Sequence, residues 1–180
     1  MDLRGNVALV TGAAGPVGTA LSTRLAGLGA SVAVLDRRPD ALAHRIGSTG
    51  GHVLALTADV TDPHSVRAAL GRLLTAWERI DIVATDAGSL ATVGPAVTGY
   101  LPYAAATGSR GIADLVVLAD PAGPNEDAVL GLRRQLDDQP VRIELVPADP
   151  PGQGSPDEVA ERVLRLIGRP CRPPAAPVEA

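Results

Sequence analysis

The sequence contains no phenylalanine and no lysine, and its only cysteine is Cys171. All sixteen basic residues are arginine, so no mechanism that needs a lysine ammonium is open to this chain. A single cysteine excludes an internal disulfide. The three histidines, His44, His52 and His64, include no pair at metal-ligand spacing. We therefore expect no metal site.

Long apolar runs are also missing. No stretch of about 18 apolar residues could span a bilayer, and the N-terminus has no apolar signal-peptide segment. The net charge of −4 provides no general attraction to nucleic acid or to an anionic membrane. We expect a cytoplasmic protein whose partner is a small-molecule substrate or another protein.

Apolar, β-branched segments alternate with segments of helical periodicity along the 180 residues. Continuous apolar strands between helices favour a parallel sheet with right-handed crossovers. We predict a single α/β domain over 1–168: a Rossmann-type doubly wound parallel sheet of about six strands, with helices on both faces. The Pro-rich segment 169–180 is predicted to be extended or disordered. The expected strands are 6–12, 31–36, 52–60, 80–88, 113–120 and 141–148, and the expected helices are 16–28, 39–46, one from 62, a short one within 96–106, 125–138 and 155–168.

The most specific stretch is TGAAGPVG, residues 11–18, between the first strand and the first helix. Backbone amides and the helix dipole meet at such a turn and favour an anion. Gly12 permits the tight turn, Gly15 lets the backbone approach a pyrophosphate, and Gly18 lets the helix lie close to the sheet. The pattern predicts a dinucleotide loop that also includes Ala14, Pro16 and Val17.

Asp36 ends the second strand, eighteen residues after Gly18. A carboxylate there accepts hydrogen bonds from a ribose diol and repels a 2′-phosphate, so NAD(H) is expected in preference to NADP(H). Arg37 and Arg38 follow directly, and an arginine could neutralise a 2′-phosphate instead. Asp36 could alternatively be a simple turn residue.

At this point the sequence resembles the short-chain dehydrogenase/reductase family, over residues 5 to about 168. TGAAGPVG is similar to the family's glycine loop, and ADV (58–60) matches its Asp-Val after the third strand. The resemblance implies that Asp59 and Val60 border the adenine. TDAG (85–88) looks like the family's NNAG with both asparagines changed, which adds Asp86, Ala87 and Gly88 to the cofactor-binding residues that the resemblance implies.

The catalytic half departs from the family, which uses Tyr, Lys, Ser and Asn. Counting back from AVLGL (128–132), the Lys position falls on Glu126 and the Tyr position on Ala122, while the Ser position lies near Asp120. The segment that carries the Asn is shortened, so no catalytic residue can be assigned. Asp120, Tyr103 and Tyr100 are candidates for a relocated acid or base. Asp120 could instead be a solvated turn residue, and the tyrosines could serve packing or a subunit contact.

Three interpretations follow. The chain could bind a nucleotide without the redox machinery, as a partner subunit or a catalyst of cyclisation, elimination or isomerisation. It could be an oxidoreductase with a relocated proton donor, or it could bind no nucleotide at all. The resemblance also implies that a homodimer would form through the helices at about 95–106 and 125–138.

Overall fold

The six strands form one parallel sheet in the order β3-β2-β1-β4-β5-β6. The computed structural model describes residues 1–107, 111–119, 126–147 and 155–168. Strands β1 and β4 lie side by side at the centre of the sheet, and the strand order reverses between them. Strands β2 and β3 follow on the β1 side, and β5 and β6 on the β4 side. This arrangement confirms the predicted Rossmann-type fold. The strands are β1 (Val7–Thr11), β2 (Ser31–Asp36), β3 (Val53–Thr57), β4 (Ile82–Asp86), β5 (Ala113–Ala119) and β6 (Val141–Pro147).

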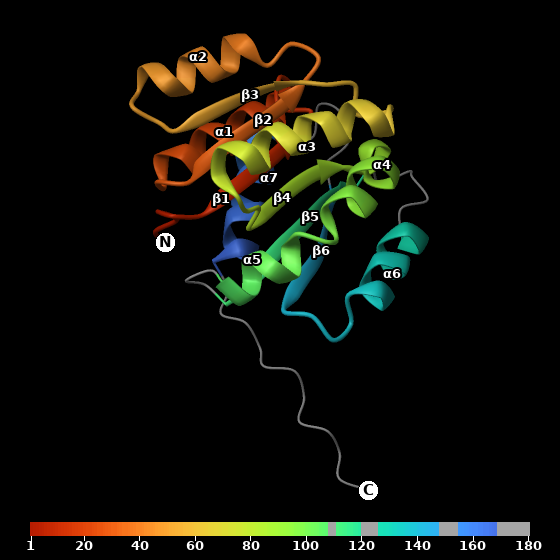
Figure 1. The fold of residues 1–180 in the computed structure, drawn as a ribbon. Coiled ribbons are helices and arrows are strands. Elements are labelled where there is room, and N and C mark those ends of the chain that lie inside the picture. Colours follow the sequence, from red (N-terminus) through yellow and green to blue (C-terminus); the bar gives the residue numbers. More distant parts are fainter. Residues whose placement is uncertain (108–110, 120–125, 148–154, 169–180) are drawn as a thin grey trace, which may run out of the picture.

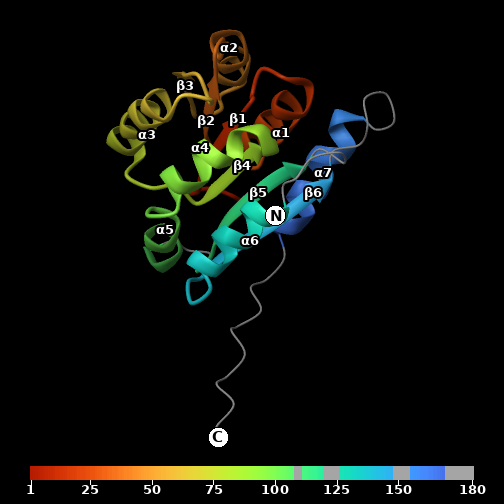
Figure 2. The same cartoon turned by 90° about the vertical axis from the view of Figure 1, so that its right-hand side faces the viewer.

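Helices cover both faces of the sheet (Figures 1 and 2). One apolar core joins the sheet to α1, α2 and α7, and a second joins it to α3, α4, α5 and α6. Burial on both faces explains why the central strands are apolar throughout rather than alternating. The helices are α1 (Pro16–Gly27), α2 (Asp40–Ser48), α3 (Pro63–Trp77), α4 (Ala87–Val97), α5 (Leu101–Thr107), α6 (Glu126–Gln135) and α7 (Pro156–Ile167).

Two local predictions were wrong at the carboxyl ends of strands. Strand β3 stops at Thr57, so Asp59 and Val60 lie in the turn before α3, where the Asp59 amide donates to Ser65 Oγ (3.0 Å). Helix α4 begins directly after β4, whereas only a short helix within 96–106 was expected. Pro95 inside α4 obscured this helix in the sequence. Burial of its apolar side chains against the sheet outweighs that local penalty.

Two buried aspartates, Asp81 and Asp114, hold strands together at the amino edge of the sheet, where the parallel strands begin. Asp81, which is 2% exposed, accepts a hydrogen bond from the Val7 amide (2.8 Å) and pairs with Arg79. The side-chain hydrogen bond from Arg79 to Asp81 raises the pKa of the Arg79 guanidinium. Asp114 on β5 pairs with Arg142 on β6 (2.6 Å). These contacts fix the strands without involving the edge that carries the glycine loop.

The last described helix, α7, has the capping box that its sequence predicts. The Ser155 hydroxyl accepts from the Glu158 amide (3.1 Å), and the Glu158 carboxylate accepts from the Ser155 amide (3.0 Å). The predicted Pro-rich tail, 169–180, lies outside the described residues. Within the described part of the chain, every helix is too short or too polar to cross a bilayer.

Candidate functional site

The glycine turn between β1 and α1 is closed so tightly that side chains would not fit. Gly12 has a φ of +59°, and the Gly15 amide donates to the Gly12 carbonyl (3.0 Å). A Cβ on Gly18 would lie 2.4 Å from the Gly12 carbonyl oxygen, and one on Gly15 would lie 3.2 Å from the same atom. The backbone therefore leaves no room for a side chain at Gly18, favours glycine at position 12 through its positive φ, and leaves only a tight fit at Gly15.

Open amides remain at the start of α1. The cap position is Gly15, which has no side chain to accept a hydrogen bond, and the first turn contains no acidic residue. The Thr19 amide bonds to the Gly15 carbonyl (2.8 Å), but among the described residues the amides of Val17 and Gly18 have no partner. The positive end of the helix dipole is thus available to an anion.

The structure brings Asp36 to this turn. Its carboxylate accepts from the Ala14 amide (3.1 Å) and from the Arg38 amide (3.2 Å). The carboxyl end of β2 thus lies beside the glycine turn, because β1 and β2 pair in parallel register. A carboxylate in this position can accept hydrogen bonds from neighbouring donors, including hydroxyl groups of a ligand.

Arg37 does not stand free beside Asp36. Its guanidinium donates to Asp59 Oδ2 (2.8 Å), while the other oxygen, Oδ1, accepts from the amide (2.9 Å) and hydroxyl (2.7 Å) of Thr61. These hydrogen bonds hold the pKa of the Asp59 carboxyl below its ordinary range, and the two from Thr61 have the largest effect. The Arg37 charge is therefore matched by a neighbouring carboxylate.

Replacing Thr61 with valine is expected to raise the pKa of Asp59 toward about 3.9, the ordinary value for aspartate. In the wild type, the lowered pKa of Asp59 stabilises the folded protein at pH values above the pKa that Asp59 has in the unfolded chain. This stabilisation is lost as the pH falls through the pKa that Asp59 has in the folded protein. An NMR titration of the Asp59 side-chain carbon measures the shift. Thr23→Val, which removes a similar exposed hydroxyl on α1, should leave that titration unchanged. An unchanged Asp59 pKa in Thr61→Val would contradict the assignment.

Asp86 lies at the end of β4 and caps α4. Its carboxylate accepts from the amide (2.9 Å) and the hydroxyl (2.7 Å) of Ser89. Below it, the hydroxyls of Thr11 and Thr85 join β1 to β4 (3.0 Å). We did not single out Ser89 from the sequence. An Asp after a strand, with Ser three positions later, is the capping pattern that could have identified it.

Two of the three catalytic candidates, Tyr100 and Tyr103, fall within the described residues. Asp120 and Ala122 lie outside the described residues, and Glu126 is the first residue of α6. Helix α4 carries the chain about 16 Å away from Asp86 along its axis, given its 11 residues. The next helix, α5, contains Ala104, whose carbonyl accepts a hydrogen bond from Arg79 at the amino edge (3.2 Å). Helix α5 therefore lies beside the amino edge.

Tyr100 and Tyr103 accordingly lie away from the glycine turn. They are 41% and 61% exposed, so neither is buried as an internal packing residue. Tyr100 borders a groove of about 420 Å³ between α3 and α4. Arg67, Leu70 and Pro95 are among the other residues that line this groove. The homodimer contact through the helices at about 95–106 and 125–138 stays a prediction.

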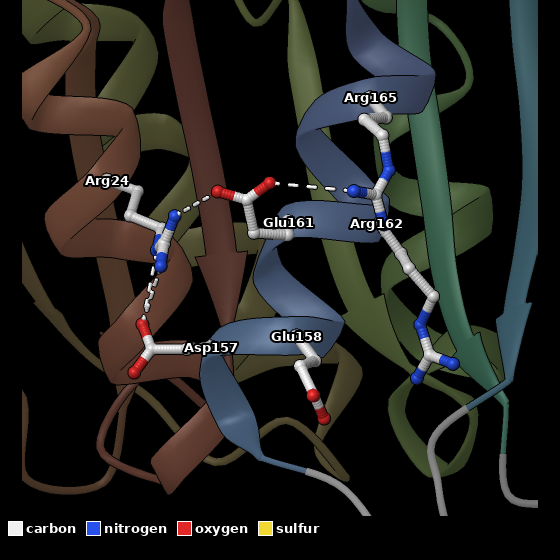
Figure 3. A pocket seen from close by; sticks show the side chains of 6 residues that line it. All are labelled: Arg24, Asp157, Glu158, Glu161, Arg162 and Arg165. Carbon is white, nitrogen blue, oxygen red and sulfur yellow. Dashed lines mark hydrogen bonds and ion pairs between the residues drawn. The ribbon is translucent and has the colours of Figure 1, made fainter.

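A separate hollow of about 470 Å³ lies between α1 and α7 (Figure 3). Arg24 of α1 points to two acids of α7 and pairs with Asp157 (3.0 Å) and Glu161 (2.5 Å). Arg165 approaches the second oxygen of Glu161 (3.6 Å). These partly exposed charges pair with one another and contribute little stability, and the apolar core that α1 and α7 share holds the two helices together.

Comparison with known proteins identifies the family. Residues 6–99 match the sequence profile of the short chain dehydrogenases, which is more than half of the chain. The chain belongs to the short-chain dehydrogenase/reductase family. A 1-deoxy-11-beta-hydroxypentalenate dehydrogenase of Streptomyces exfoliatus is 41% identical over 97 residues. A cyclohexanol dehydrogenase of a Rhodococcus species is 38% identical over 103 residues.

These matches cover only part of each protein. They span 52% and 49% of this chain, and 35% and 38% of the two relatives. The chain therefore matches little more than a third of the length of these relatives. A solved metagenomic short-chain oxidoreductase in complex with NADP shares the fold, with a TM-score of 0.75 at 21% identity, over 93% of this chain and 92% of that one.

The glycine turn fits the dinucleotide that the family implies. A Cβ on Gly18 would fill the space against the Gly12 carbonyl, and the amides of Val17 and Gly18 are open to an acceptor. Asp36 adds a carboxylate beside them. Pro16 begins α1, Val60 packs partly against the core, and Ala87 and Gly88 begin α4. The structure thus gathers these predicted cofactor-binding residues along one edge of the sheet.

Proposed function

We propose that this short-chain dehydrogenase/reductase binds a nicotinamide dinucleotide, NAD(H) in preference to NADP(H), without the family's tyrosine–lysine proton transfer. The chain would then catalyse a non-redox reaction such as cyclisation, elimination or isomerisation, or act as a non-catalytic partner subunit. The observation that carries the proposal is the combination of a complete glycine turn with a sequence that contains no lysine.

Three features support the nucleotide part of the proposal. The amides of Val17 and Gly18 would hold the diphosphate, and the dipole of α1 would favour its charge. Asp36 would accept hydrogen bonds from the ribose hydroxyls and repel a 2′-phosphate. The Arg37 charge, which could otherwise attract that phosphate, is matched by Asp59.

The placement of the tyrosines supports the loss of the standard chemistry. When bound, a nicotinamide dinucleotide supplies hydride transfer, and a positioned acid must then move a proton. Tyr100 and Tyr103 are the chain's only tyrosines, and they lie toward the amino edge. The family match ends at residue 99, before the segment in which the family carries its Tyr and Lys. A relocated tyrosine donor would have to act from the wrong edge of the sheet.

Titration of the purified chain with NADH and NADPH tests the nucleotide part. NADH at about 100 times its Kd should add about 2.7 kcal/mol to the free energy of unfolding, and NADPH should add less at equal concentration. Asp36→Asn should weaken NADH binding about tenfold and reduce the preference, because a charge-assisted hydrogen bond to the ribose is lost. Asp40→Asn, an exposed change in the first turn of α2, is the matched control. Equal stabilisation by both cofactors would contradict the preference, and none by either would favour the scaffold that binds no nucleotide.

Turnover assays test the second part. A broad panel of ketones and alcohols with bound cofactor should produce no hydride transfer, measured by NADH absorbance. Should a substrate turn over, Tyr103→Phe and Asp120→Asn would separate the relocated donors by their rates. Measurable turnover that either substitution abolishes would replace the proposal with the oxidoreductase alternative.

A further inference from the structure

Asp86 is an acid held rigidly at the candidate site. Its carboxylate receives hydrogen bonds from both the amide and the hydroxyl of Ser89, which is 1% exposed. As the cap of α4, it is also fixed to the first turn of that helix. The carboxylate therefore cannot easily turn away.

The same carboxylate lies against the glycine turn. A Cβ on Gly12 would be 3.5 Å from Asp86 Oδ2, and a Cβ on Gly88 would be 3.1 Å from Oδ1. Two residues without side chains thus flank the carboxylate, and Gly12 belongs to the turn whose amides would hold a diphosphate. Any anion bound by that turn experiences the charge of Asp86.

Within the described ranges, the charge of Asp86 has no ion-pair partner. Asp59, on the other side of the site, pairs with Arg37. Both hydrogen-bond donors to Asp86 belong to Ser89, and no arginine among the described residues forms an ion pair with it. Neutral donors hold the carboxylate in place without cancelling its charge, so its field extends to the turn.

We propose that Asp86 is a specificity-determining residue that weakens binding in proportion to the phosphate charge of the ligand. This inference rests on the proposed nucleotide binding. Adenosine and other uncharged nucleosides escape the penalty, whereas ligands with a diphosphate incur it. Repulsion between like charges at a partly exposed site is expected to weaken binding by about tenfold.

Asp86→Asn isolates the charge. The asparagine oxygen can still accept from the Ser89 amide, its NH2 group can donate to the Ser89 hydroxyl, and asparagine caps helices as well as aspartate does. Calorimetric titration at low ionic strength compares adenosine, ADP-ribose and NAD⁺ on both proteins. ADP-ribose and NAD⁺ should bind the variant about tenfold more tightly, adenosine should be unaffected, and added salt should shrink the difference.

Asp62→Asn provides the matched control. Asp62 caps α3 through the His64 amide (3.0 Å) and the Ser65 amide (3.2 Å), so the same charge is removed from another helix cap. This variant should bind all three ligands like the wild type. Tighter binding of ADP-ribose by Asp62→Asn to the same extent would overturn a specific role for Asp86.

The remaining outcomes separate the inference from the proposed function. Wild-type binding of ADP-ribose that Asp86→Asn leaves unchanged overturns the inference but retains nucleotide binding. Equal tightening of adenosine and ADP-ribose overturns it as well, because shape rather than charge would then be responsible. Binding of ADP-ribose by the variant alone supports the inference strongly. Failure of both proteins to bind any of the three ligands overturns the proposed function, and the inference falls with it.

Discussion

Gly18→Ala is expected to lower the free energy of unfolding by about 1–3 kcal/mol and to abolish nucleotide binding. The added Cβ would meet the Gly12 carbonyl oxygen at 2.4 Å and the Ala13 Cα at 2.7 Å. Both contacts are to backbone, which cannot swing aside as a flexible side chain could. The turn must therefore open, and the amides of Val17 and Gly18 lose their positions. Urea denaturation and titration with NADH measure the two effects.

Gly27→Ala is the matched control on the same helix. Gly27 is the last residue of α1, and nothing lies within 4 Å of its Cβ position. Alanine there should leave nucleotide binding intact and add up to about 1 kcal/mol of stability, since glycine is a poor helix former. Equally tight NADH binding by Gly18→Ala and Gly27→Ala would contradict the prediction that the nucleotide site requires the close approach of α1 to the glycine turn.

Asp81→Ala is expected to lower the free energy of unfolding by about 3–5 kcal/mol. The carboxylate is buried at the amino edge, where it accepts from the Val7 amide (2.8 Å) and pairs with Arg79. Alanine would leave the buried Val7 amide without its acceptor, and the partly buried Arg79 guanidinium would lose its carboxylate partner while keeping its hydrogen bond to the Ala104 carbonyl. A fall in the midpoint of urea denaturation with an unchanged slope measures the loss.

Asp2→Ala is the control: it removes an acid from an exposed ion pair with Arg4 and should leave the midpoint of urea denaturation close to the wild-type value. Folded Asp81→Ala should bind NADH like the wild type under native conditions, because Asp81 lies at the opposite ends of the strands from the glycine turn. A loss below about 1 kcal/mol, or a changed nucleotide affinity in the folded protein, would contradict this separation of stability from binding.

The strands, the glycine turn and the last helix could be predicted because each depends on residues that are close along the chain. Buried parallel strands appear as short apolar runs, and the cap of α7 appears as Ser155 with Glu158 three positions later. The start of α4 could not be predicted in this way. Gly88, Gly94 and Pro95 weaken its local helical signal, and burial of Leu90, Val93 and Val97 against the sheet stabilises it instead.

The same distinction between local and long-range features applies to the candidate site. From the sequence, Asp36 was expected beside the glycine turn, since both follow from one strand–helix–strand unit. The pairing of Arg37 with Asp59 was not expected, because it depends on where β3 ends and how the following turn folds. The separation of Tyr100 and Tyr103 from the site depends on the direction and length of α4, which spacing alone does not indicate.

The sequence by itself determined the fold class, the glycine turn and the exclusion of lysine chemistry, since these depend on residue identity and short-range periodicity. Only the tertiary structure decided that Asp86 lies against Gly12. Thr11 and Thr85, their neighbours, are 74 positions apart and meet because β1 and β4 pair at the centre of the sheet. That pairing results from burying apolar faces between two helical layers, a long-range constraint that no local stretch of sequence carries.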